Sequence, residues 1–384
     1  MIISRVILKN WRNFKSVDVS LRPRMFVVGP NASGKSNFLD VFRFLRDIAK
    51  SGGGLQSALN SRGGLSKIRC LSARKSPDIE IEVYLTDGKN SATLWRYAIG
   101  IKQQGRGHRR QQLSYERVWR GEDLILNRPD EHDQTDELRL TQTFLEQIIA
   151  NEAFRDVAAF FDAIAYRHLI PQLIRYNETF KGSELPDDPF GQIFLDHIAQ
   201  TPERTRNARL KKIESALQKA VPQLKNLSLI RDDLGVPHLE ITYQHWRRAG
   251  AKQREDQFSD GTLRLIGLLW MFLEGDSLLL LEEPELSLNS GIVERIPRLM
   301  HRLLKHQKKQ RQVILSTHSY ELLSDKGIGG EEVLMLIPSA EGTEIKCAND
   351  NQDIHRLLSG GLSPAEAIVP YTIPENIQQL ELFR

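Results

Sequence analysis

The stretch VVGPNASGKSN, residues 27–37, decides how the rest of this 384-residue sequence is interpreted. A short apolar segment precedes it and a helical pattern follows it, and Gly29, Gly34, Lys35 and Ser36 have the spacing G-x-x-x-x-G-K-S. Glycines let consecutive backbone N–H groups turn toward phosphates, the lysine reaches the β and γ phosphates, and the hydroxyl holds Mg²⁺. The stretch therefore predicts a phosphate-binding loop between a strand and a helix, in preference to a plain Gly/Ser turn.

Composition sets the outer bounds. A length of 384 residues predicts two or three domains, and 40% apolar residues suffice for a sizeable core. The two cysteines, Cys70 and Cys347, lie far apart and match no metal spacing, which favours a reducing compartment. No stretch approaches about 18 uninterrupted apolar residues, and the N-terminus lacks the apolar segment of a signal peptide. We therefore expect a soluble, cytoplasmic protein with no membrane partner.

The net charge of +4 is compatible with nucleic-acid binding but is too small to indicate it. Local basic clusters are more suggestive, and they cover residues 102–110, 204–212, 247–248 and 305–311. A basic run is more often a solvated loop or a helix end than a DNA contact, so both interpretations stay open for each cluster.

The first third of the sequence has mostly the period of β-strands. Alternating apolar and polar residues predict strands at 2–8, 17–21, 79–85, 93–101 and 113–119. The helix after the phosphate-binding loop carries Phe38, Val41 and Leu45 on one face, as a helix buried beneath a sheet should. The glycine-rich residues 51–64 are expected to form a loop.

Helical spacing of apolar residues begins near residue 141, after the polar, turn-rich residues 127–137. A strand at 238–243 is then expected to return the chain to the main sheet. We therefore expect four parts: the first part of a nucleotide-binding domain at 1–126, a helical insertion at 140–225, the second part of the domain at 238–347, and a C-terminal tail at 348–384.

A second chemical motif follows residues 277–281, SLLLL, which read as a short strand buried on both faces. This run ends in Glu282-Glu283-Pro284-Glu285. An apolar strand with carboxylates at its end is where a P-loop ATPase places its metal-side acid and its water-orienting base. We assign Glu282 to Mg²⁺, through water, and Glu283 to the attacking water, and the alternative is an exposed acidic turn.

A histidine follows the next predicted core strand. Residues 291–305 predict one long amphipathic helix in which Pro297 introduces a kink, and residues 312–315 predict a short buried strand. His318 comes directly after that strand, and a histidine beside a phosphate site can sense the γ-phosphate by hydrogen bonding. The plain alternative is a structural histidine.

The segment 258–270, FSDGTLRLIGLLW, opens a helix just ahead of the carboxylate strand. Ser259, Asp260 and Gly261 form a polar cap, and the free N–H groups of such a helix start can bind a phosphate. The residues alone do not distinguish this site from an ordinary capped helix.

Together these segments resemble the ABC-type ATPases of the SMC/RecF/OLD group, and most closely the stand-alone AAA-domain ATPases related to the OLD family. The resemblance is carried by LKNWRNF at 8–14, GPNASGKSN at 29–37, YRHLIPQLIR at 166–175, FSDGTLRL at 258–265, LLLLEEPELSLN at 278–289 and LSTHS at 315–319. It implies an α/β fold: an ABC-type P-loop ATPase head with a mixed sheet core, an antiparallel β lobe and a helical insertion. The sequence departs from the transporters of this class at Glu282, where they have Asp, and Gln56 is the candidate for the Q-loop glutamine.

The resemblance also implies cofactors and site residues. ATP and Mg²⁺ would be bound in a homodimer or higher homo-oligomer in which two heads enclose two nucleotides. Lys35, Glu283 and His318 would be catalytic, and Ser36 and Glu282 would hold the metal. The nucleotide would be contacted by Gly29, Asn31, Ser33, Gly34, Lys35, Ser36, Asn37, Arg12 and Asn13, and from the other protomer by Ser259 and Gly261.

The sequence lacks what the OLD nucleases carry after a comparable histidine strand, because no second acidic strand, HNH motif or Cys/His motif follows residues 333–337. We therefore expect an ATPase that regulates a separately encoded effector, a nuclease or toxin, in anti-phage defence. Its apolar tail, 362–384, is expected to dock on the head or on that partner. Two alternatives stay open: a RecF/SMC-like DNA-binding clamp in DNA repair or maintenance, and an assembly that holds a toxin or nuclease inactive until a phage signal arrives.

Overall fold

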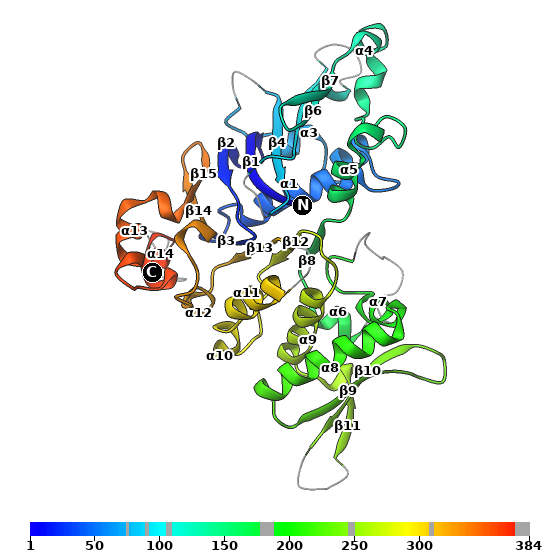
Figure 1. Cartoon of the computed structure of the whole chain (residues 1–384), viewed down its shortest axis with the longest axis vertical. Helices are drawn as coiled ribbons and strands as arrows, with labels where there is room; N and C mark the ends of the chain where they lie inside the picture. Colours follow the sequence, from blue (N-terminus) through cyan, green and yellow to red (C-terminus); the bar gives the residue numbers. More distant parts are fainter. Residues whose placement is uncertain are drawn as a thin grey trace, which may run out of the picture. The chain divides into compact units, whose positions relative to one another are not determined.

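The chain divides into two structural units, each built from discontinuous segments (Figure 1). The first unit comprises Met1–Ala165, Ser277–Leu280 and Gln307–Arg384, and the second comprises Tyr166–Asp276 and Leu281–His306. This computed structural model describes residues 1–73, 77–88, 92–104, 110–176, 188–244, 250–306 and 311–372.

An antiparallel sheet forms the β lobe of the first unit. Its strand order is β2-β1-β4-β5-β6-β7, with β1 (Ile2–Trp11), β2 (Phe14–Ser20), β4 (Ile79–Thr86), β5 (Trp95–Gln103), β6 (Gln111–Arg120) and β7 (Asp123–Arg128). All five strands predicted by alternation are present, because their apolar positions are buried on one face while the polar positions stay accessible. The edge strand β7 was not predicted.

A second six-stranded sheet is mixed. Its order is β15-β14-β3-β13-β12-β8, with β15 (Gly342–Cys347), β14 (Val333–Ser339), β3 (Arg24–Val28), β13 (Val313–Thr317), β12 (Leu279–Glu282) and β8 (Ala165–Arg167). Strands β13 and β14 run parallel to β3, and β15 runs antiparallel to β14. Every residue of β3 and β13 is buried, as expected for strands covered on both faces.

Helix α1 (Lys35–Ala49) follows the phosphate-binding loop and is buried along most of its length. Its aromatic residues pack against the first two strands: the rings of Phe44 and Trp11 have centroids 5.2 Å apart, and those of Phe38 and Phe14 are 6.4 Å apart. The predicted amphipathic helix beneath a sheet is therefore confirmed.

The second unit combines helices with a small sheet of its own. It contains α6 (Pro171–Arg175), α7 (Phe194–Gln200), α8 (Glu203–Ala220), β9 (Leu224–Arg231), β10 (Pro237–Tyr243), β11 (Ala251–Arg254), η3 (Glu255–Gln257), α9 (Asp260–Leu273), α10 (Ser290–Val293) and α11 (Ile296–His306). The predicted strand at 238–243 does not return to the main sheet, because β10 pairs instead with β9 and β11 in an antiparallel ladder.

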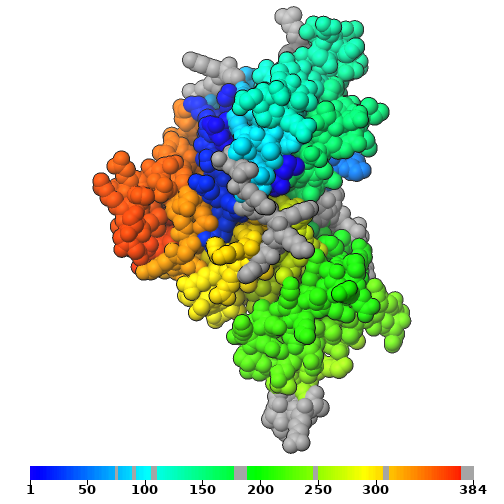
Figure 2. All heavy atoms as spheres, viewed as in Figure 1, coloured from blue at the N-terminus to red at the C-terminus, as the bar shows by residue number. Residues whose placement is uncertain are grey.

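Short segments of the first unit connect these layers or follow them. They are α2 (Leu55–Asn60), α3 (Leu65–Ile68), α4 (Glu131–Thr135), η1 (Glu137–Thr141), η2 (Glu152–Phe154), α5 (Arg155–Asp162), α12 (Tyr320–Leu323), η4 (Gly330–Glu332), η5 (Ala348–Asp350), α13 (Gln352–Ser359), α14 (Pro364–Ile368) and η6 (Val369–Thr372). Figure 2 shows the segments from α13 onward, in orange to red, at the molecular surface. The last part of the predicted tail, residues 373–384, lies outside the described residues.

The glycine-rich stretch after α1 is not the loop that its composition predicted. It contains α2, whose Leu55 and Leu59 are fully buried, and it leads directly into α3. Apolar burial therefore outweighs the local preference of glycine for irregular structure.

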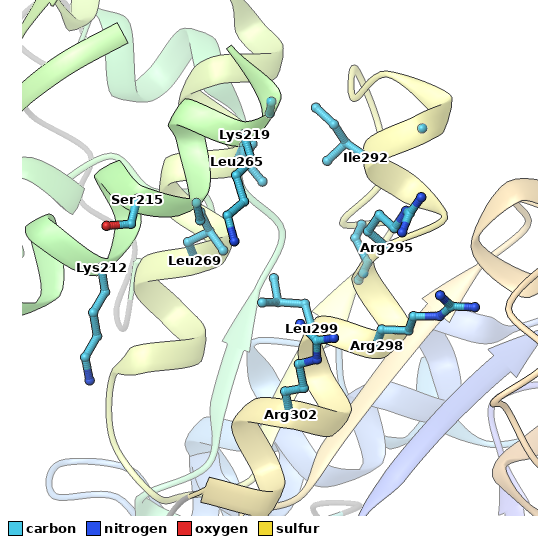
Figure 3. A pocket seen from close by; sticks show the side chains of 14 residues that line it. Lys212, Ser215, Lys219, Leu265, Leu269, Ile292, Arg295, Arg298, Leu299 and Arg302 are labelled. Atoms are coloured by element: carbon cyan, nitrogen blue, oxygen red, sulfur yellow. The ribbon is translucent and has the colours of Figure 1, made fainter. Parts of the chain in front are cut away.

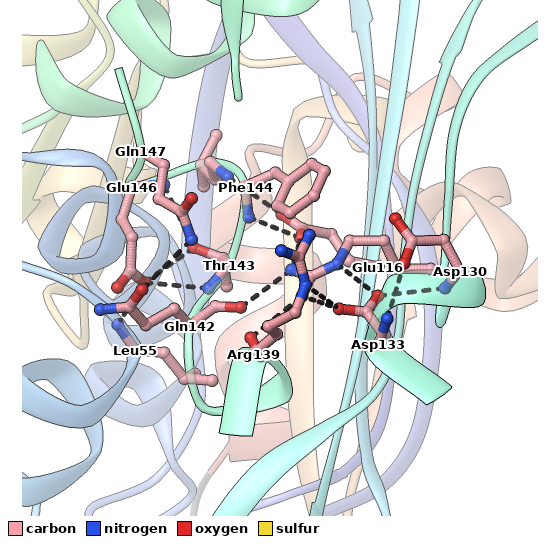
Figure 4. A network of polar contacts seen from close by, with 12 residues as sticks. Leu55, Glu116, Asp130, Asp133, Arg139, Gln142, Thr143, Phe144, Glu146 and Gln147 are labelled. Carbon is pink, nitrogen blue, oxygen red and sulfur yellow. Dashed lines mark hydrogen bonds and ion pairs between the residues drawn. The ribbon is translucent and has the colours of Figure 1, made fainter. Parts of the chain in front are cut away.

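The helix predicted from residue 141 is also absent between residues 142 and 151. The carboxylate of Glu116 on β6 accepts hydrogen bonds from the backbone N–H groups of Phe144 and Leu145, at 2.7 and 3.1 Å. Figure 4 draws Glu116 beside Phe144. These N–H groups donate to a side chain of the β lobe instead of to carbonyl oxygens within a helix. Ile148 and Ile149, which the helix would have buried, are exposed. The hydrogen bonds to the buried Glu116 carboxylate therefore outweigh the helical spacing of the apolar residues, because a buried carboxylate without hydrogen-bond donors would be costly.

The single helix predicted at 291–305 is two helices, α10 and α11, separated by a turn at Glu294 and Arg295. Pro297 does not kink a continuous helix. It lies in the first turn of α11, where backbone N–H groups have no intrahelical acceptor, so the proline costs no hydrogen bond. Within the described ranges, no helix is long and apolar enough to cross a lipid bilayer.

Candidate functional site

The phosphate-binding loop connects the end of β3 to the start of α1. Gly34 precedes the helix in the left-handed conformation, with φ of 101°, and no side chain caps the helix start. The N–H groups of the first turn of this 15-residue helix therefore face the loop without a side-chain acceptor. Together with the positive end of the helix dipole, they form a site for an anion.

Lys35 is the buried cation of this loop. Its side chain is 7% exposed, and Nζ donates to the carbonyl oxygens of Gly29 at 3.0 Å and Pro30 at 3.2 Å. The hydroxyl of Ser33 is fully buried and has no hydrogen-bond partner among the described residues. A buried ammonium and a buried hydroxyl, beside a helix start that no side chain caps, fit the oxygens of a phosphate chain.

Asn13 fixes the conformation of this loop from the β1–β2 turn. Its Nδ2 donates to the carbonyl oxygen of Ser33 and to Thr343 Oγ1, both at 2.8 Å, and its Oδ1 accepts from Asn37 Nδ2 at 2.8 Å. A Cβ atom at Gly34 would lie only 2.3 Å from Asn13 Nδ2. The glycine is therefore required by close packing as well as by its positive φ.

Arg12 lies against α1 instead of on the loop. Its guanidinium contacts Asp40 at 2.6 Å, and Arg62 contacts the same carboxylate at 2.8 Å. Burial alone would raise the pKa of Asp40, but the two arginines outweigh it and hold that pKa below its usual value. The structure thus gives Arg12 a carboxylate partner on the helix that follows the phosphate-binding loop.

His318 lies at the same sheet edge as the phosphate-binding loop. Strand β13 runs parallel to β3 with Thr317 opposite Val28, so His318 and Gly29 both follow the carboxyl ends of neighbouring strands. The side chain of His318 is exposed, and Ser319 caps α12 by accepting from the N–H of Leu322 at 3.1 Å. The edge of an α/β sheet at its carboxyl ends is where ligands usually bind.

Glu282 and Glu283 stand at the end of β12, in the second unit. The hydroxyl of Tyr166 donates to the Glu282 carboxylate, and His168 Nδ1 donates to the Glu282 carbonyl oxygen at 3.0 Å. Glu283 has a φ of 42°, a left-handed conformation that is uncommon outside glycine and concentrated at functional sites. Tyr166 and His168 were missed as site residues, although both lie in the segment 166–175 that carries part of the family resemblance.

The start of α9 is held rigidly in the second unit. Ser259 caps the helix, its Oγ accepting from the N–H of Thr262 at 3.2 Å. Asp260 accepts from Arg175 Nη2 at 2.6 Å and from Gln172 Nε2 at 2.8 Å. A Cβ atom on Gly261 would lie 2.7 Å from the carbonyl oxygen of Ser287, so this glycine allows close contact with the segment after the carboxylate motif.

Arg264 continues this connection one turn along α9. Its side chain is buried, and its Nε has no hydrogen-bond partner among the described residues. Burial lowers the pKa of Arg264 more than the charges of Glu285, Asp260 and Glu283 raise it. The arginine therefore couples the start of α9 electrostatically to the carboxylate motif.

Metal binding would rest on oxygen ligands. In the described part of the chain, no three His, Cys, Asp or Glu side chains gather to hold an ion. The predicted donors, the Ser36 hydroxyl and the Glu282 carboxylate, are of the type that Mg²⁺ prefers, with phosphate oxygens completing its shell. Gln56 is engaged elsewhere, because its Nε2 donates to the carbonyl oxygens of Gln111 at 3.0 Å and Thr141 at 2.8 Å.

Residues 24–324 match the family described as AAA domain, putative AbiEii toxin, Type IV TA system. No curated protein sequence matches the chain.

Two solved structures resemble the fold. One is an SMC head bound to the C-winged helix domain of ScpA, with a TM-score of 0.54, 16% identity, and coverage of 90% of this chain and 98% of that one. The other is the Smc head domain of Pyrococcus furiosus with an extended coiled coil, bound to the C-terminal domain of ScpA, with a TM-score of 0.52, 13% identity, and coverage of 90% and 95%. At such low sequence identity, the similarity to these structures is evidence about the fold alone. It confirms the predicted ABC-type α/β class.

Proposed function

Because the chain belongs to the family described as AAA domain, putative AbiEii toxin, Type IV TA system, we propose that it dimerises around ATP and Mg²⁺ to regulate a separately encoded effector. The chain has the fold of an ATPase of the AAA/SMC-head type. The proposal adds that ATP is hydrolysed, that the effector is a nuclease or toxin, and that the system acts in anti-phage defence.

The observation that carries the nucleotide proposal is the anion site at the start of α1. Lys35 Nζ is held by two carbonyl oxygens of its own loop, and it can transfer to the β and γ phosphates without leaving the buried site. Gly29, Asn31, Ser33 and Asn37 line the same loop and would contact the phosphate chain through their backbone N–H groups or side chains.

Hydrolysis would use the carboxylates at the end of β12. When bound by Ser36 and Glu282, Mg²⁺ would neutralise charge on the phosphate oxygens. Glu283 would orient the attacking water, and His318 would donate a hydrogen bond to the γ-phosphate. The Tyr166 hydroxyl supports this assignment because it fixes the Glu282 carboxylate from β8.

Dimerisation would complete each site through Ser259 and Gly261 of the second protomer. The start of α9 supports this role, since Ser259 is exposed while the helix behind it is anchored by the Arg175–Asp260 ion pair. Such an anchored helix start can contact a phosphate without rearranging. ATP binding would close the dimer and hydrolysis would open it.

The experiment that tests the effector proposal is a pull-down of tagged Glu283→Gln protein from its native host with ATP present, with protein and nucleic acid both identified. We expect a nuclease or toxin encoded next to this chain, and we expect it to be lost from the Lys35→Ala control. Recovery of DNA alone, or of the same proteins with both variants, would contradict the effector proposal.

The DNA-binding clamp is the second candidate, and one observation favours it. Arg204, Lys211 and Lys212 of the basic cluster on α8 are exposed. The cluster is only partly available, because Arg209 stacks on Trp270 at 5.1 Å and pairs with Glu274 at 3.6 Å. A steep decrease of DNA affinity with salt would favour this candidate. The cluster at 247–248 lies outside the described residues, as do 105–109 and 307–310 of two others.

A further inference from the structure

The second unit contains a basic groove that the nucleotide-binding residues do not use. Its volume is about 670 Å³, and it is lined by residues of α8, α9, α10, α11 and the turn between the last two, including Lys212, Lys219, Arg295, Arg298 and Arg302. Figure 3 shows the α8 and α9 side chains on one side and those of α10, α11 and the turn between them on the other. A volume of this size is within the range that holds a substantial ligand.

Apolar residues form the floor between these cations. Leu265 and Leu269 come from α9, and Ile292 and Leu299 face them from α10 and α11. Ile292 and Leu299 are partly exposed, so the apolar surface is accessible from solvent. A ligand that fits this groove needs an apolar face as well as negative charge.

Four of the five cations on the rim have no anionic partner within the described structure. Neither Lys212 nor Lys219, and neither Arg295 nor Arg302, forms an ion pair with a described residue, and no Asp or Glu lines the groove. Arg209, which is also on α8 but does not line the groove, does have partners: it pairs with Glu274 and stacks on Trp270. Like charges placed around one groove repel each other, and an anionic ligand would relieve that repulsion.

We propose that this groove binds an acidic amphipathic helix of a protein partner. Such a helix presents apolar side chains at i, i+3, i+4 and i+7 to the floor, while its Asp and Glu side chains reach the basic rim. Duplex DNA matches the rim but not the floor, because a phosphodiester backbone has no apolar face to cover Ile292 and Leu299. This inference rests on the proposed function in one respect, that the partner is separately encoded.

The test uses the full chain and a fluorescein-labelled model peptide of about five helical turns, with Leu on one face and Glu on the other. Binding is measured by fluorescence anisotropy. Three probes are compared with it: a scrambled peptide of the same composition, a peptide with Lys in place of Glu, and a short DNA duplex. We expect the acidic amphipathic peptide to bind, the scrambled peptide to bind at least about tenfold more weakly, and the Lys peptide not to bind.

Two neighbouring lysines supply matched variants. Lys212 lines the groove, whereas Lys211 is equally exposed on α8 but does not line it. Lys212→Glu and Arg302→Glu should each weaken peptide binding by about tenfold, and Lys211→Glu should leave it within about twofold. Equal losses in Lys211→Glu and Lys212→Glu would show a general charge effect and would overturn the proposal.

Three other outcomes also overturn it. These are absence of peptide binding, equal binding of the scrambled peptide, and binding of the DNA duplex alone with loss in the groove variants, which would make the groove a nucleic-acid site. A stoichiometric self-association of the chain that the groove variants abolish would assign the groove to a second copy. Measuring peptide affinity in the Lys35→Ala background separates this test from the proposed function, because the groove does not depend on the phosphate-binding loop.

Discussion

Lys35 is buried in the phosphate-binding loop, and its charge is held by carbonyl dipoles of Gly29 and Pro30. Neutral carbonyls stabilise an ammonium less than phosphate anions do, so the loop is prepared to exchange the first for the second. Substitution of Lys35 therefore tests nucleotide binding directly, and the result does not depend on the identity of the effector.

Lys35→Ala should abolish ATP binding, with affinity reduced by at least about 100-fold. The substitution removes the ammonium group that would face the β and γ phosphates. Isothermal titration calorimetry measures this effect. Lys67→Ala on α3 is the control, since Lys67 is exposed. An unchanged affinity in Lys35→Ala would disprove the assignment of the phosphate-binding loop.

Glu283→Gln should leave ATP affinity unchanged while it slows hydrolysis by about 10²–10³-fold, because an amide keeps the shape of the side chain but does not accept the proton. Phosphate release under single-turnover conditions measures the rate. The variant should also accumulate as an ATP-bound dimer in size-exclusion chromatography. Hydrolysis at the parental rate would place the base elsewhere.

At the scale of elements, the β lobe is joined to the segment after it by a buried ionic network (Figure 4). Arg128, at the end of β7, has a fully buried side chain that pairs with Asp133 at 2.8 Å and Glu116 at 3.1 Å. Its guanidinium also lies 4.0 Å from the ring of Phe144. The network connects β6, β7, α4 and the irregular residues that follow.

Arg128→Met should destabilise the protein by about 3–5 kcal/mol, because Glu116 would be left buried without its cation and Asp133 would keep only Arg139, at 3.3 Å. Chemical denaturation followed by circular dichroism measures the change. Arg117→Met on β6 is the control, because Arg117 is exposed, and it should cost at most about 1 kcal/mol. A loss in Arg128→Met no larger than in this control would mean that the network is not a stabilising element.

A second ionic contact holds β10 to η3. His238 Nδ1 pairs with Glu255 at 2.6 Å, and His238 Nε2 lies 3.5 Å from Asp232. Burial alone would lower the pKa of His238, but the hydrogen bond and charge of Glu255, with Asp232, raise it above the ordinary value of 6.5. The stabilisation is therefore complete below that ordinary value and is lost as the pH rises through the folded-state pKa.

His238→Gln should lower the melting temperature more at about pH 6 than at about pH 8.5, since only the protonated imidazole gains from both carboxylates. Differential scanning fluorimetry at the two pH values measures the difference. His301→Gln on α11 serves as the control because His301 is exposed. A larger effect of His238→Gln at high pH would contradict the assigned sign.

The elements that the sequence predicted are those in which local pattern and burial agree. Strand β3, helix α1 and the capped start of α9 combine strong periodicity with turn or cap residues, and all three are present. Residues 142–151 and the strand β9 were not predicted correctly. Their conformation depends on Glu116 in one case and on pairing with β10 in the other, which are contacts between distant residues.

At the scale of the whole molecule, the candidate site is distributed over discontinuous segments. Motif spacing predicted the phosphate-binding loop, the carboxylates and the histidine, because each lies within a few residues. Tyr166 and His168 could not be found in that way, since their relation to Glu282 exists only after β8 and β12 form. The sharing of sites between protomers stays a prediction.

Mixing Lys35→Ala protomers with Ser259→Arg protomers should restore one competent site in each mixed dimer if the sites are shared, because that composite site has both an intact loop and an intact α9 start. Each variant alone should be inactive. ATPase activity of the mixture measures the effect. The controls are the two unmixed variants, each at the same total protein concentration. Complete inactivity of the mixture would argue against sites formed in trans.

The position of β3 within its sheet has a consequence for synthesis of the protein. β3 leaves the ribosome well before its neighbour β13, because Val313 lies opposite Arg24 and follows it by 289 residues in the sequence. At about 5–20 residues per second, the nascent β3 waits for tens of seconds with both edges unpaired. An early translation product would carry the whole phosphate-binding motif yet could not hold a nucleotide, and its exposed strand would need a chaperone until β13 emerges.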